Sequence, residues 1–257
     1  MAKKIGETHK QVTDLKRNLV GIKPYIATPA YDGKVDSDYA LSLADSVMLA
    51  ASLGVGCTVA CMGNGAFIDI ARNNFVRMFL ETDCTHLFFI DADLKWEPRA
   101  FIGLLAGCVD ERPVVAGMYR RRQDPEEYPV KYVEADEGGL QVVQGGWVEC
   151  ERVPTGFLCI QRNIIEEMAK DAKMWKQHKS PDIPALFYTQ VLEDGRYMGE
   201  DFSWCDDYCD RYDTHIHVWP DFDFVHGGYK CNWHSFMNEQ VDKYEQAKSM
   251  KVIGGGK

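Results

Sequence analysis

Apolar and polar positions follow two different periods along the chain up to residue 119. Short apolar runs bounded by turn residues are typical of buried strands, whereas apolar positions three and four apart are typical of helices. The pattern predicts strands at residues 22–30, 57–62, 86–90 and 113–119, and helices at residues 37–54, 67–82 and 98–109. Strands that alternate with helices over short loops indicate βαβ units and a mostly parallel sheet.

The second half of the chain has a different pattern. Short alternating runs with Gly-Gly turns over residues 128–161 predict a small antiparallel or mixed addition to the sheet. Helices are predicted at residues 162–177 and 199–212, and a strand is predicted at residues 216–228, with His226 at its end. The predicted fold class is therefore α/β, a Rossmann-type and mostly parallel sheet flanked by helices, with a mixed β addition in the second half.

Composition narrows the classes of protein that fit. The 257 residues carry a formal net charge of -10, which disfavours nonspecific nucleic-acid binding over the whole surface but not a local basic groove. No apolar run reaches the roughly 18 residues of a membrane helix, and the basic N-terminus lacks the apolar core of a secretory signal. The nine cysteines are scattered and odd in number, which predicts free thiols and a reducing compartment, the cytoplasm or, for a viral protein, the host cytoplasm.

A pair of acids, Asp91 and Asp93, comes directly after the apolar run at residues 87–90. Burying a carboxylate is costly without a partner, so these acids are either solvated in a loop or helix cap, or shared with a cation. Parallel sheets place ligand sites at the carboxyl ends of strands, and Thr28 and Tyr31 also come at such an end. Mg²⁺ and Mn²⁺ are usually held by one or two carboxylates and by substrate phosphates, so the pattern favours a divalent-metal site.

Six segments carry a family resemblance in their order along the chain. They are IATPAYDG, IARNNFV, THLFFIDADLKWEP, VPTGFLCIQR, GEDFSWCDD and VHGG, between about residues 22 and 230. The series resembles glycosyltransferases of the GT-A fold, most of all viral and bacterial family-2-like enzymes and more distantly fungal Anp1-type mannosyltransferases. Each motif alone is common, whereas the ordered series is more specific.

The resemblance implies a role for each matching residue. The residues expected to contact a nucleotide-sugar donor are Thr28, Pro29, Tyr31, Arg72, Asn73, Asp91 and Asp93. The expected ligands of Mn²⁺ or Mg²⁺ are Asp91, Asp93 and His226, and the expected acceptor contacts are Thr155, Gly156 and Trp204. Asp201, or Glu200 in its place, is the expected general base for the acceptor hydroxyl.

The same resemblance implies a division of the chain. An N-terminal arm at residues 1–21 precedes one GT-A-like domain at residues 22–257, in which residues 22–125 bind the donor, residues 126–240 bind the acceptor and residues 241–257 form a tail. The implied reaction is the metal-dependent transfer of a sugar to a hydroxyl of a glycan, a small molecule or a modified nucleobase in DNA.

Two other functions fit the same fold class. A sugar-phosphate nucleotidyltransferase normally carries a Gly-rich, basic phosphate loop near the first strand, where this chain has a single glycine and Lys34. A non-catalytic module that binds nucleotide or sugar is the second alternative. Residues 54–65 are Gly-rich but lack the G-x-G-x-x-G pattern, which disfavours a dinucleotide oxidoreductase.

Several motifs also have a purely structural interpretation. Arg72 fits a surface helix, and the acids at residues 200–201 fit a helix N-terminus, which favours negative charge. The basic stretch at residues 120–122 is either a solvated loop or a contact for an anionic acceptor or diphosphate. Zinc is a weaker alternative, because no second cysteine pair accompanies its candidate ligands, Cys205, Cys209, His215 and His217.

Overall fold

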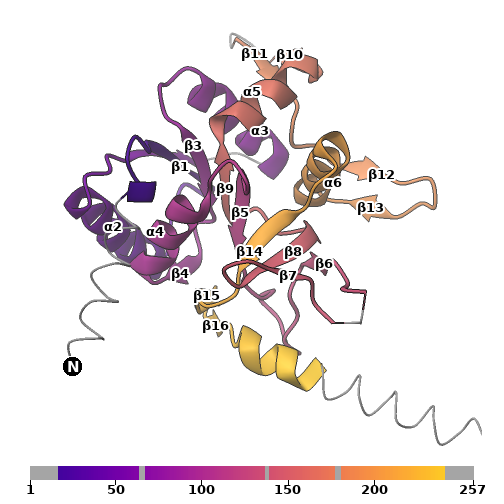
Figure 1. Cartoon of the computed structure of the whole chain (residues 1–257). Helices are drawn as coiled ribbons and strands as arrows, with labels where there is room; N and C mark the ends of the chain where they lie inside the picture. Colours follow the sequence, from indigo (N-terminus) through magenta and orange to yellow (C-terminus); the bar gives the residue numbers. More distant parts are fainter. Residues whose placement is uncertain (1–16, 64–66, 137–138, 177–180, 241–257) are drawn as a thin grey trace, which may run out of the picture.

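The computed structural model describes residues 17–63, 67–136, 139–176 and 181–240, and a nine-stranded sheet forms its centre (Figure 1). The strands are β1 (Pro24–Ala30), β2 (Thr58–Gly63), β3 (His86–Ile90), β5 (Val114–Gly117), β6 (Lys131–Tyr132), β7 (Val142–Val143), β8 (Trp147–Arg152), β9 (Phe157–Gln161) and β14 (Ile216–Trp219). Their order is β2-β1-β3-β9-β5-β14-β8-β6, and β7 pairs with β8.

Most strands of this sheet point in one direction. β1 is parallel to β2 and β3, and β5 is parallel to β14. β9 is antiparallel to both β3 and β5, and β8 is antiparallel to β14. The predicted α/β class is thereby confirmed, with one correction. β9 was expected in an addition to the sheet, yet it lies in the middle, between two strands of the first half.

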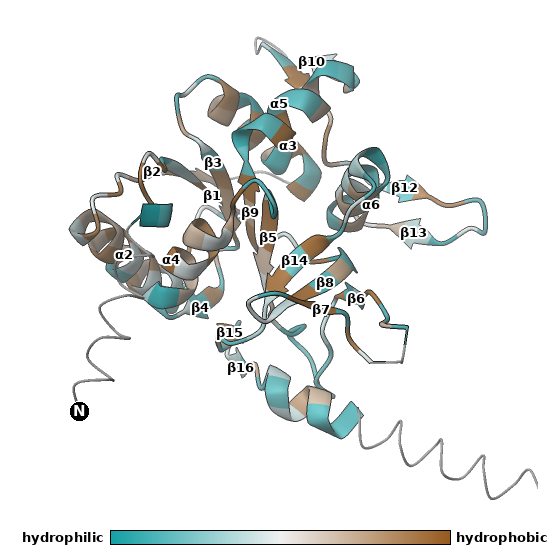
Figure 2. Ribbon diagram, viewed as in Figure 1, coloured by the Kyte–Doolittle hydropathy of each residue, from teal (hydrophilic) through white to brown (hydrophobic). Residues whose placement is uncertain are grey.

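Helices cover the sheet on both faces. They are α2 (Ser37–Ser52), α3 (Ile68–Leu80), α4 (Pro98–Gly107), α5 (Arg162–Asp171) and α6 (Glu200–Tyr212), and residues 233–240 are also helical. Successive side chains of a strand point to opposite faces. Phe88 of β3 contacts Phe101 of α4 with ring centroids 5.0 Å apart, whereas Phe89 contacts Phe75 of α3 at 6.5 Å. α3 and α4 therefore lie on opposite faces, which explains why β3 is buried at every position and apolar over residues 87–90 (Figure 2).

Several predicted boundaries are wrong. The expected strand at residues 216–228 is two strands in different sheets, because Pro220, which lacks an N–H donor, follows β14. The second of these, β15 (Phe224–His226), pairs with β4 (Leu94–Trp96) and β16 (Tyr229–Lys230). α5 ends before the predicted residue 177, since the chain continues into β10 (Met174–Lys176), which pairs with β11 (Asp182–Pro184).

One further hairpin, β12 (Gln190–Val191) with β13 (Tyr197–Met198), leads into α6. Residues 1–16 of the expected arm and the expected tail at residues 241–257 lie outside the described residues. All nine cysteines fall within the described part and are free thiols, as predicted. No helix in the described ranges is both long and apolar enough to cross a membrane.

Candidate functional site

Backbone hydrogen bonds attach three distant segments to the turn at residues 91–93, which follows β3. The N–H of Asp91 donates to the carbonyl of Gly156 at 2.9 Å, and the N–H of Gly227 donates to the carbonyl of Asp93 at 2.9 Å. The loop after β1 joins them, because the N–H of Asp36 donates to the carbonyl of Ala92 at 2.9 Å. Four predicted motifs therefore meet where β1 and β3 end, as expected for the carboxyl edge of a parallel sheet.

Asp93 and His226 face each other across the pairing of β4 with β15. Nε2 of His226 lies 3.5 Å from Oδ1 of Asp93, and Nη1 of Arg122 lies 2.7 Å from Oδ2. Nδ1 of His226 lies 2.8 Å from the carbonyl oxygen of Arg120. A carbonyl only accepts, so Nδ1 carries the proton and donates it, and this fixes Nε2 toward Asp93.

Asp93 and His226 each shift the pKa of the other. Burial alone would raise the pKa of Asp93, but His226 and Arg122 bring that pKa below its usual value. Burial alone would lower the pKa of His226, but the hydrogen bonds to Asp93 and to the Arg120 carbonyl raise it. An unprotonated Nε2 would point its lone pair at a carboxylate, so the arrangement needs a proton or a cation at Nε2.

The donor set fits a divalent cation in part. Carboxylate and imidazole are suitable ligands for Mn²⁺, and Asp93 and His226 present both at one point. Both aspartates of the turn are also paired with arginines, Asp91 with Arg72 at 3.3 Å and Asp93 with Arg122 at 2.7 Å. Among the described residues no group of three or more His, Cys, Asp or Glu side chains is arranged to hold a metal. The zinc alternative at Cys205 and Cys209 fails for the same reason.

Arg72 is a buried cation between two acids. Its Nη2 lies 3.3 Å from Oδ1 of Asp91 and its Nε lies 3.1 Å from Oε1 of Glu200, and its side chain is only 4% exposed. The guanidinium also lies over the ring of Phe89, 5.3 Å from its centroid. Burial opposes the charge of Arg72, yet Asp91 and Glu200 raise its pKa above the usual value. Of the two expectations for Arg72, diphosphate or acid, the acid is the partner in this structure.

Two buried polar atoms beside this cluster lack a partner within the described chain, Nη1 of Arg72 and Oγ1 of Thr155. Buried polar atoms are normally hydrogen-bonded, so unpaired ones point to water, an ion or a ligand at that place. Gly156 is pressed between Asp91 and Tyr119, since a Cβ at this position would collide with both side chains. Its N–H donates to the hydroxyl of Tyr119 at 2.9 Å. Thr155 and Gly156 therefore lie next to Asp91 and Tyr119, and their predicted contact with an acceptor stays a prediction.

Asp201 lies in the first turn of α6 and lines a cavity. Burial, reinforced by the neighbouring charge of Glu200, raises the pKa of Asp201 to about 6. Its carboxylate accepts the N–H of Phe202 at 2.8 Å. Glu200, by contrast, is held by Arg72. The two adjacent acids therefore have different tasks, and the preference for Asp201 over Glu200 as the base is consistent with this geometry.

The cavity beside Asp201 has a volume of about 590 Å³. His226 and Tyr119 line it together with residues of the β12–β13 hairpin. The full lining is Tyr119, Arg120, Arg121, Pro129, Arg152, Pro154, Leu192, Arg196, Tyr197, Met198, Gly199, Asp201, Phe202 and His226. The candidate base and the candidate metal-ligand histidine thus share one cavity.

Three predicted ligand contacts have internal roles instead. The hydroxyl of Thr28 is fully buried and hydrogen-bonded to that of Tyr39. Asn73 binds backbone, because its Nδ2 donates to the carbonyl of Phe187 at 2.7 Å and its Oδ1 accepts the N–H of the same residue at 2.9 Å. Trp204 is fully buried and stacks on Phe187 with ring centroids 5.6 Å apart, so it walls no cavity.

The other two donor predictions lie at the end of β1. Tyr31 is 76% exposed just after the strand, and Pro29 is partly buried within it. Their loop is the one that Asp36 attaches to the turn at residues 91–93. Both therefore lie in a segment that borders the candidate site, and their contact with a donor stays a prediction.

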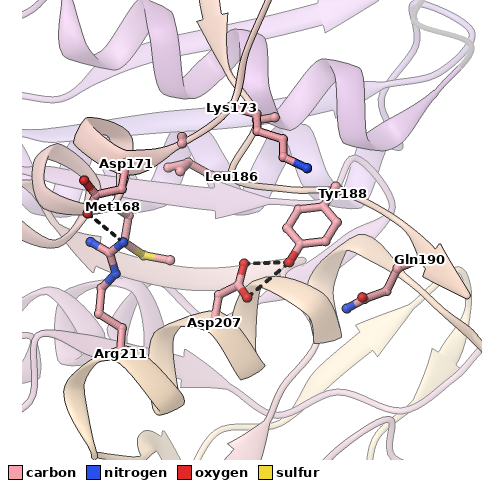
Figure 3. Close-up of a pocket in the computed structure, with 10 residues that line it drawn as sticks. Met168, Asp171, Lys173, Leu186, Tyr188, Gln190, Asp207 and Arg211 are labelled. Carbon is pink, nitrogen blue, oxygen red and sulfur yellow. Dashed lines mark hydrogen bonds and ion pairs between the residues drawn. The ribbon is translucent and has the colours of Figure 1, made fainter. Parts of the chain in front are cut away.

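A second cavity, of about 680 Å³, also takes residues from α6 (Figure 3). Four of its polar side chains form two pairs. The hydroxyl of Tyr188 donates to the carboxylate of Asp207 at 2.9 Å, and Arg211 lies 3.0 Å from Asp171. None of Asp91, Asp93, Glu200, Asp201 and His226 lines this second cavity. We therefore assign the candidate chemistry to the smaller cavity beside Asp201.

Sequence reasoning missed two residues of that cavity, Arg152 and Arg196. Arg152 ends β8, and Arg196 lies between β12 and β13. Single arginines in short strands and turns carry no spacing signal, so only the tertiary structure brings them to Asp201.

Comparisons with known proteins support the fold. No family model and no curated protein matches the sequence. Among solved structures, A197 from STIV aligns with a TM-score of 0.51 and 16% identity over 80% of this chain and 85% of that chain. GalNAc-T7 with UDP, GalNAc and Mn²⁺ aligns with a TM-score of 0.43 and 9% identity over 80% and 43%. The inositol-1-phosphate CTP transferase from T. maritima aligns with a TM-score of 0.40 and 12% identity over 80% and 89%.

The likeness to A197 shows a shared fold and nothing about activity. It agrees with the α/β architecture described above, a central sheet flanked by helices. The other two likenesses are too distant to carry an argument.

Proposed function

We propose that this protein is a GT-A-like glycosyltransferase that moves a sugar from a nucleotide-sugar donor to a hydroxyl acceptor. One observation carries the proposal: Asp201 and His226 line the same cavity, and His226 faces Asp93 at the end of the turn at residues 91–93. These residues come from segments far apart in the sequence, and their convergence is what such a reaction requires.

Asp201 is the proposed general base. As the acceptor oxygen bonds to the anomeric carbon, the bond from that carbon to the diphosphate breaks, and its electron pair leaves with the nucleoside diphosphate. The hydroxyl proton passes to Asp201. A carboxylate with a pKa of about 6 is ionised at neutral pH yet more basic than an ordinary aspartate, which suits this task.

Asp93 and His226 are the proposed ligands of Mn²⁺ or Mg²⁺. Such an ion stabilises the negative charge that builds on a departing diphosphate. The hydrogen bond from His226 to the Arg120 carbonyl holds the imidazole in position. Arg72 keeps Asp91 and Glu200 in place, and its buried, unpartnered Nη1 is the donor that we assign to an oxygen of the nucleotide sugar.

Sugar-phosphate nucleotidyltransfer is the less favoured reaction. In that reaction the attacking group is a phosphate, which is already anionic near neutral pH and needs no base. A buried carboxylate of raised pKa beside the cavity is better explained by a hydroxyl acceptor.

The test is a panel of nucleotide sugars and nucleoside triphosphates, each with and without Mn²⁺. We expect at least one nucleotide sugar to raise the melting temperature in the presence of metal, and to release its nucleoside diphosphate during turnover. Release of pyrophosphate from a nucleoside triphosphate and a sugar phosphate would establish nucleotidyltransfer instead. Binding without any turnover would favour a non-catalytic module.

A further inference from the structure

The charged side chains that line the cavity beside Asp201 are mainly cations. Arg120, Arg121, Arg152 and Arg196 line it, whereas Asp201 is its only acid within the described residues. Arg120 directs its guanidinium to the carbonyl of Lys230 and to a nearby carboxylate, so it is committed to the protein. The other three arginines differ from it in how they are held.

Arg121, Arg152 and Arg196 each retain hydrogen-bond donors that the described residues do not use. Arg152 pairs with Asp206 through Nε at 2.6 Å. Arg196 pairs with Asp194 through Nε at 2.7 Å, and Arg121 pairs with Glu127 through Nε at 3.3 Å. A guanidinium has five N–H groups in a fixed fork, so Nη1 of Arg152 and both Nη atoms of the other two remain for a ligand.

Two of these ion pairs, those of Arg121 and Arg196, are easy to exchange for contacts with a bound anion, whereas Arg152 keeps its bidentate pair with Asp206 and offers its remaining Nη1. None of the three partner acids lines the cavity, and Glu127 and Asp194 are about half exposed. Exposed ion pairs contribute only about 0–1 kcal/mol to stability. A ligand that brings its own negative charge therefore replaces or extends these contacts at little cost.

We infer that the acceptor carries a phosphate group, which lies among Arg121, Arg152 and Arg196 while the acceptor hydroxyl faces Asp201. This inference rests on the proposed function, because it names the class of acceptor for the same reaction. Arginine forks match the oxygens of phosphate, and three of them suit a dianion better than a single carboxylate. Phe202 lies under the Arg152 guanidinium, 5.7 Å from ring centroid to carbon, and adds an apolar wall to the same cavity.

Binding of inorganic phosphate to the full chain tests the inference without a donor or a metal. Its affinity is measured by titrating the melting temperature at constant ionic strength, with acetate as the carboxylate probe and chloride as the reference ion. We expect phosphate to stabilise the protein more than acetate. Arg196→Ala and Arg152→Ala should each weaken phosphate binding by about tenfold, the loss of one charge-assisted contact.

Arg77→Ala is the matched control, because Arg77 on α3 pairs with Glu81 and lies outside the cavity lining. It should bind phosphate as the natural protein does. Circular dichroism shows whether Arg152→Ala is folded, and if it is not, Arg196→Ala decides. Equal effects of phosphate and acetate, or unchanged phosphate affinity in the arginine variants, would overturn the inference.

A failure of the proposed function can be distinguished from a failure of the phosphate-site inference. Donor binding is tested with nucleotide sugars and metal in the absence of any acceptor. A protein that binds phosphate through Arg196 but binds no nucleotide sugar would keep this anion site and lose the glycosyltransferase assignment.

Discussion

The two arginine sites of this protein hold positive charge in opposite ways. Arg72 is buried beneath the site and bridges Asp91 to Glu200 over the ring of Phe89. Arg196, at the cavity, is 75% exposed and pairs with one exposed acid. A buried cation that joins two acids fixes the positions of the segments that carry them. An exposed cation with a single weak partner is available to a ligand.

The largest effect should come from breaking the buried site. Arg72→Ala leaves two largely buried carboxylates without their cation, and removal of one partner of a buried ion pair typically costs about 3–5 kcal/mol. We expect a loss of that order in the free energy of unfolding, measured by chemical denaturation. Arg196→Ala is the matched variant and should change it by less than about 1 kcal/mol. Similar losses in both variants would remove the distinction between the two sites.

The second prediction concerns Asp201, which Arg72 does not bind. Asp201→Asn keeps the size of the side chain but cannot take a proton, so kcat should fall by about 10²–10⁴-fold while donor affinity changes little. Asp207→Asn is the control, since Asp207 lies on the same helix but lines the other cavity. Near-normal turnover in Asp201→Asn would assign the proton to another group.

The third prediction concerns Asp93 as a ligand of the metal. Asp93→Ala should weaken metal-dependent donor binding about tenfold or more, as should a chelator added to the natural protein, because Asp93 faces the histidine. Calorimetric titration of the donor, with and without Mn²⁺, measures both effects. Equal donor affinity with and without chelator would exclude the metal from binding.

The pH dependence of turnover should follow Asp201. Its pKa of about 6 means that the carboxylate is mostly protonated below that pH and cannot act as a base. The rate kcat should therefore rise with pH through about 6 and level off above 7. A profile that is flat between pH 5 and 7 would contradict a titrating base in this range.

The smallest effect should be on stability, and its sign is opposite to that on activity. A carboxyl group whose pKa is raised on folding stabilises the folded state at low pH and loses that contribution as pH rises through about 6. Asp201→Asn cannot ionise, so its melting temperature at pH 7.5 should exceed that of the natural protein by a few degrees. A lower melting temperature at that pH would show that the carboxylate contributes other contacts.

The periodicity of the chain was sufficient to predict the first half of the sheet. β3 was placed at its observed bounds because both of its faces are apolar and because Asp91 interrupts the apolar run. The place of β9 could not be predicted, since apolar runs give no strand order. The break at Pro220, by contrast, follows from the sequence, since proline lacks the N–H that a strand interior needs.

The sequence motifs predicted which residues come together around one turn and one cavity, whereas the roles of those residues toward a donor, a metal or an acceptor stay predictions. The placement of Asp91, Asp93, His226, Gly156 and Asp201 around one turn and one cavity agrees with the motif order. The predicted contacts of Thr28, Asn73 and Trp204 were not met, because a polar or aromatic side chain next to a motif is equally suited to an internal hydrogen bond or to a stack. Their burial depends on helix and loop packing, which sequence spacing does not encode.

The central position of β9 also sets the order in which the chain can fold as it is synthesised. β3 and β5 both hydrogen-bond to β9, and β9 ends at residue 161. The first half therefore leaves the ribosome with the β9-facing edges of β3 and β5 unpaired, and they stay unpaired until more than 40 further residues have followed β5. The other edge of β5 pairs with β14, which is synthesised later still. A fragment that ends near residue 125 would expose those edges permanently, and exposed apolar edges promote aggregation.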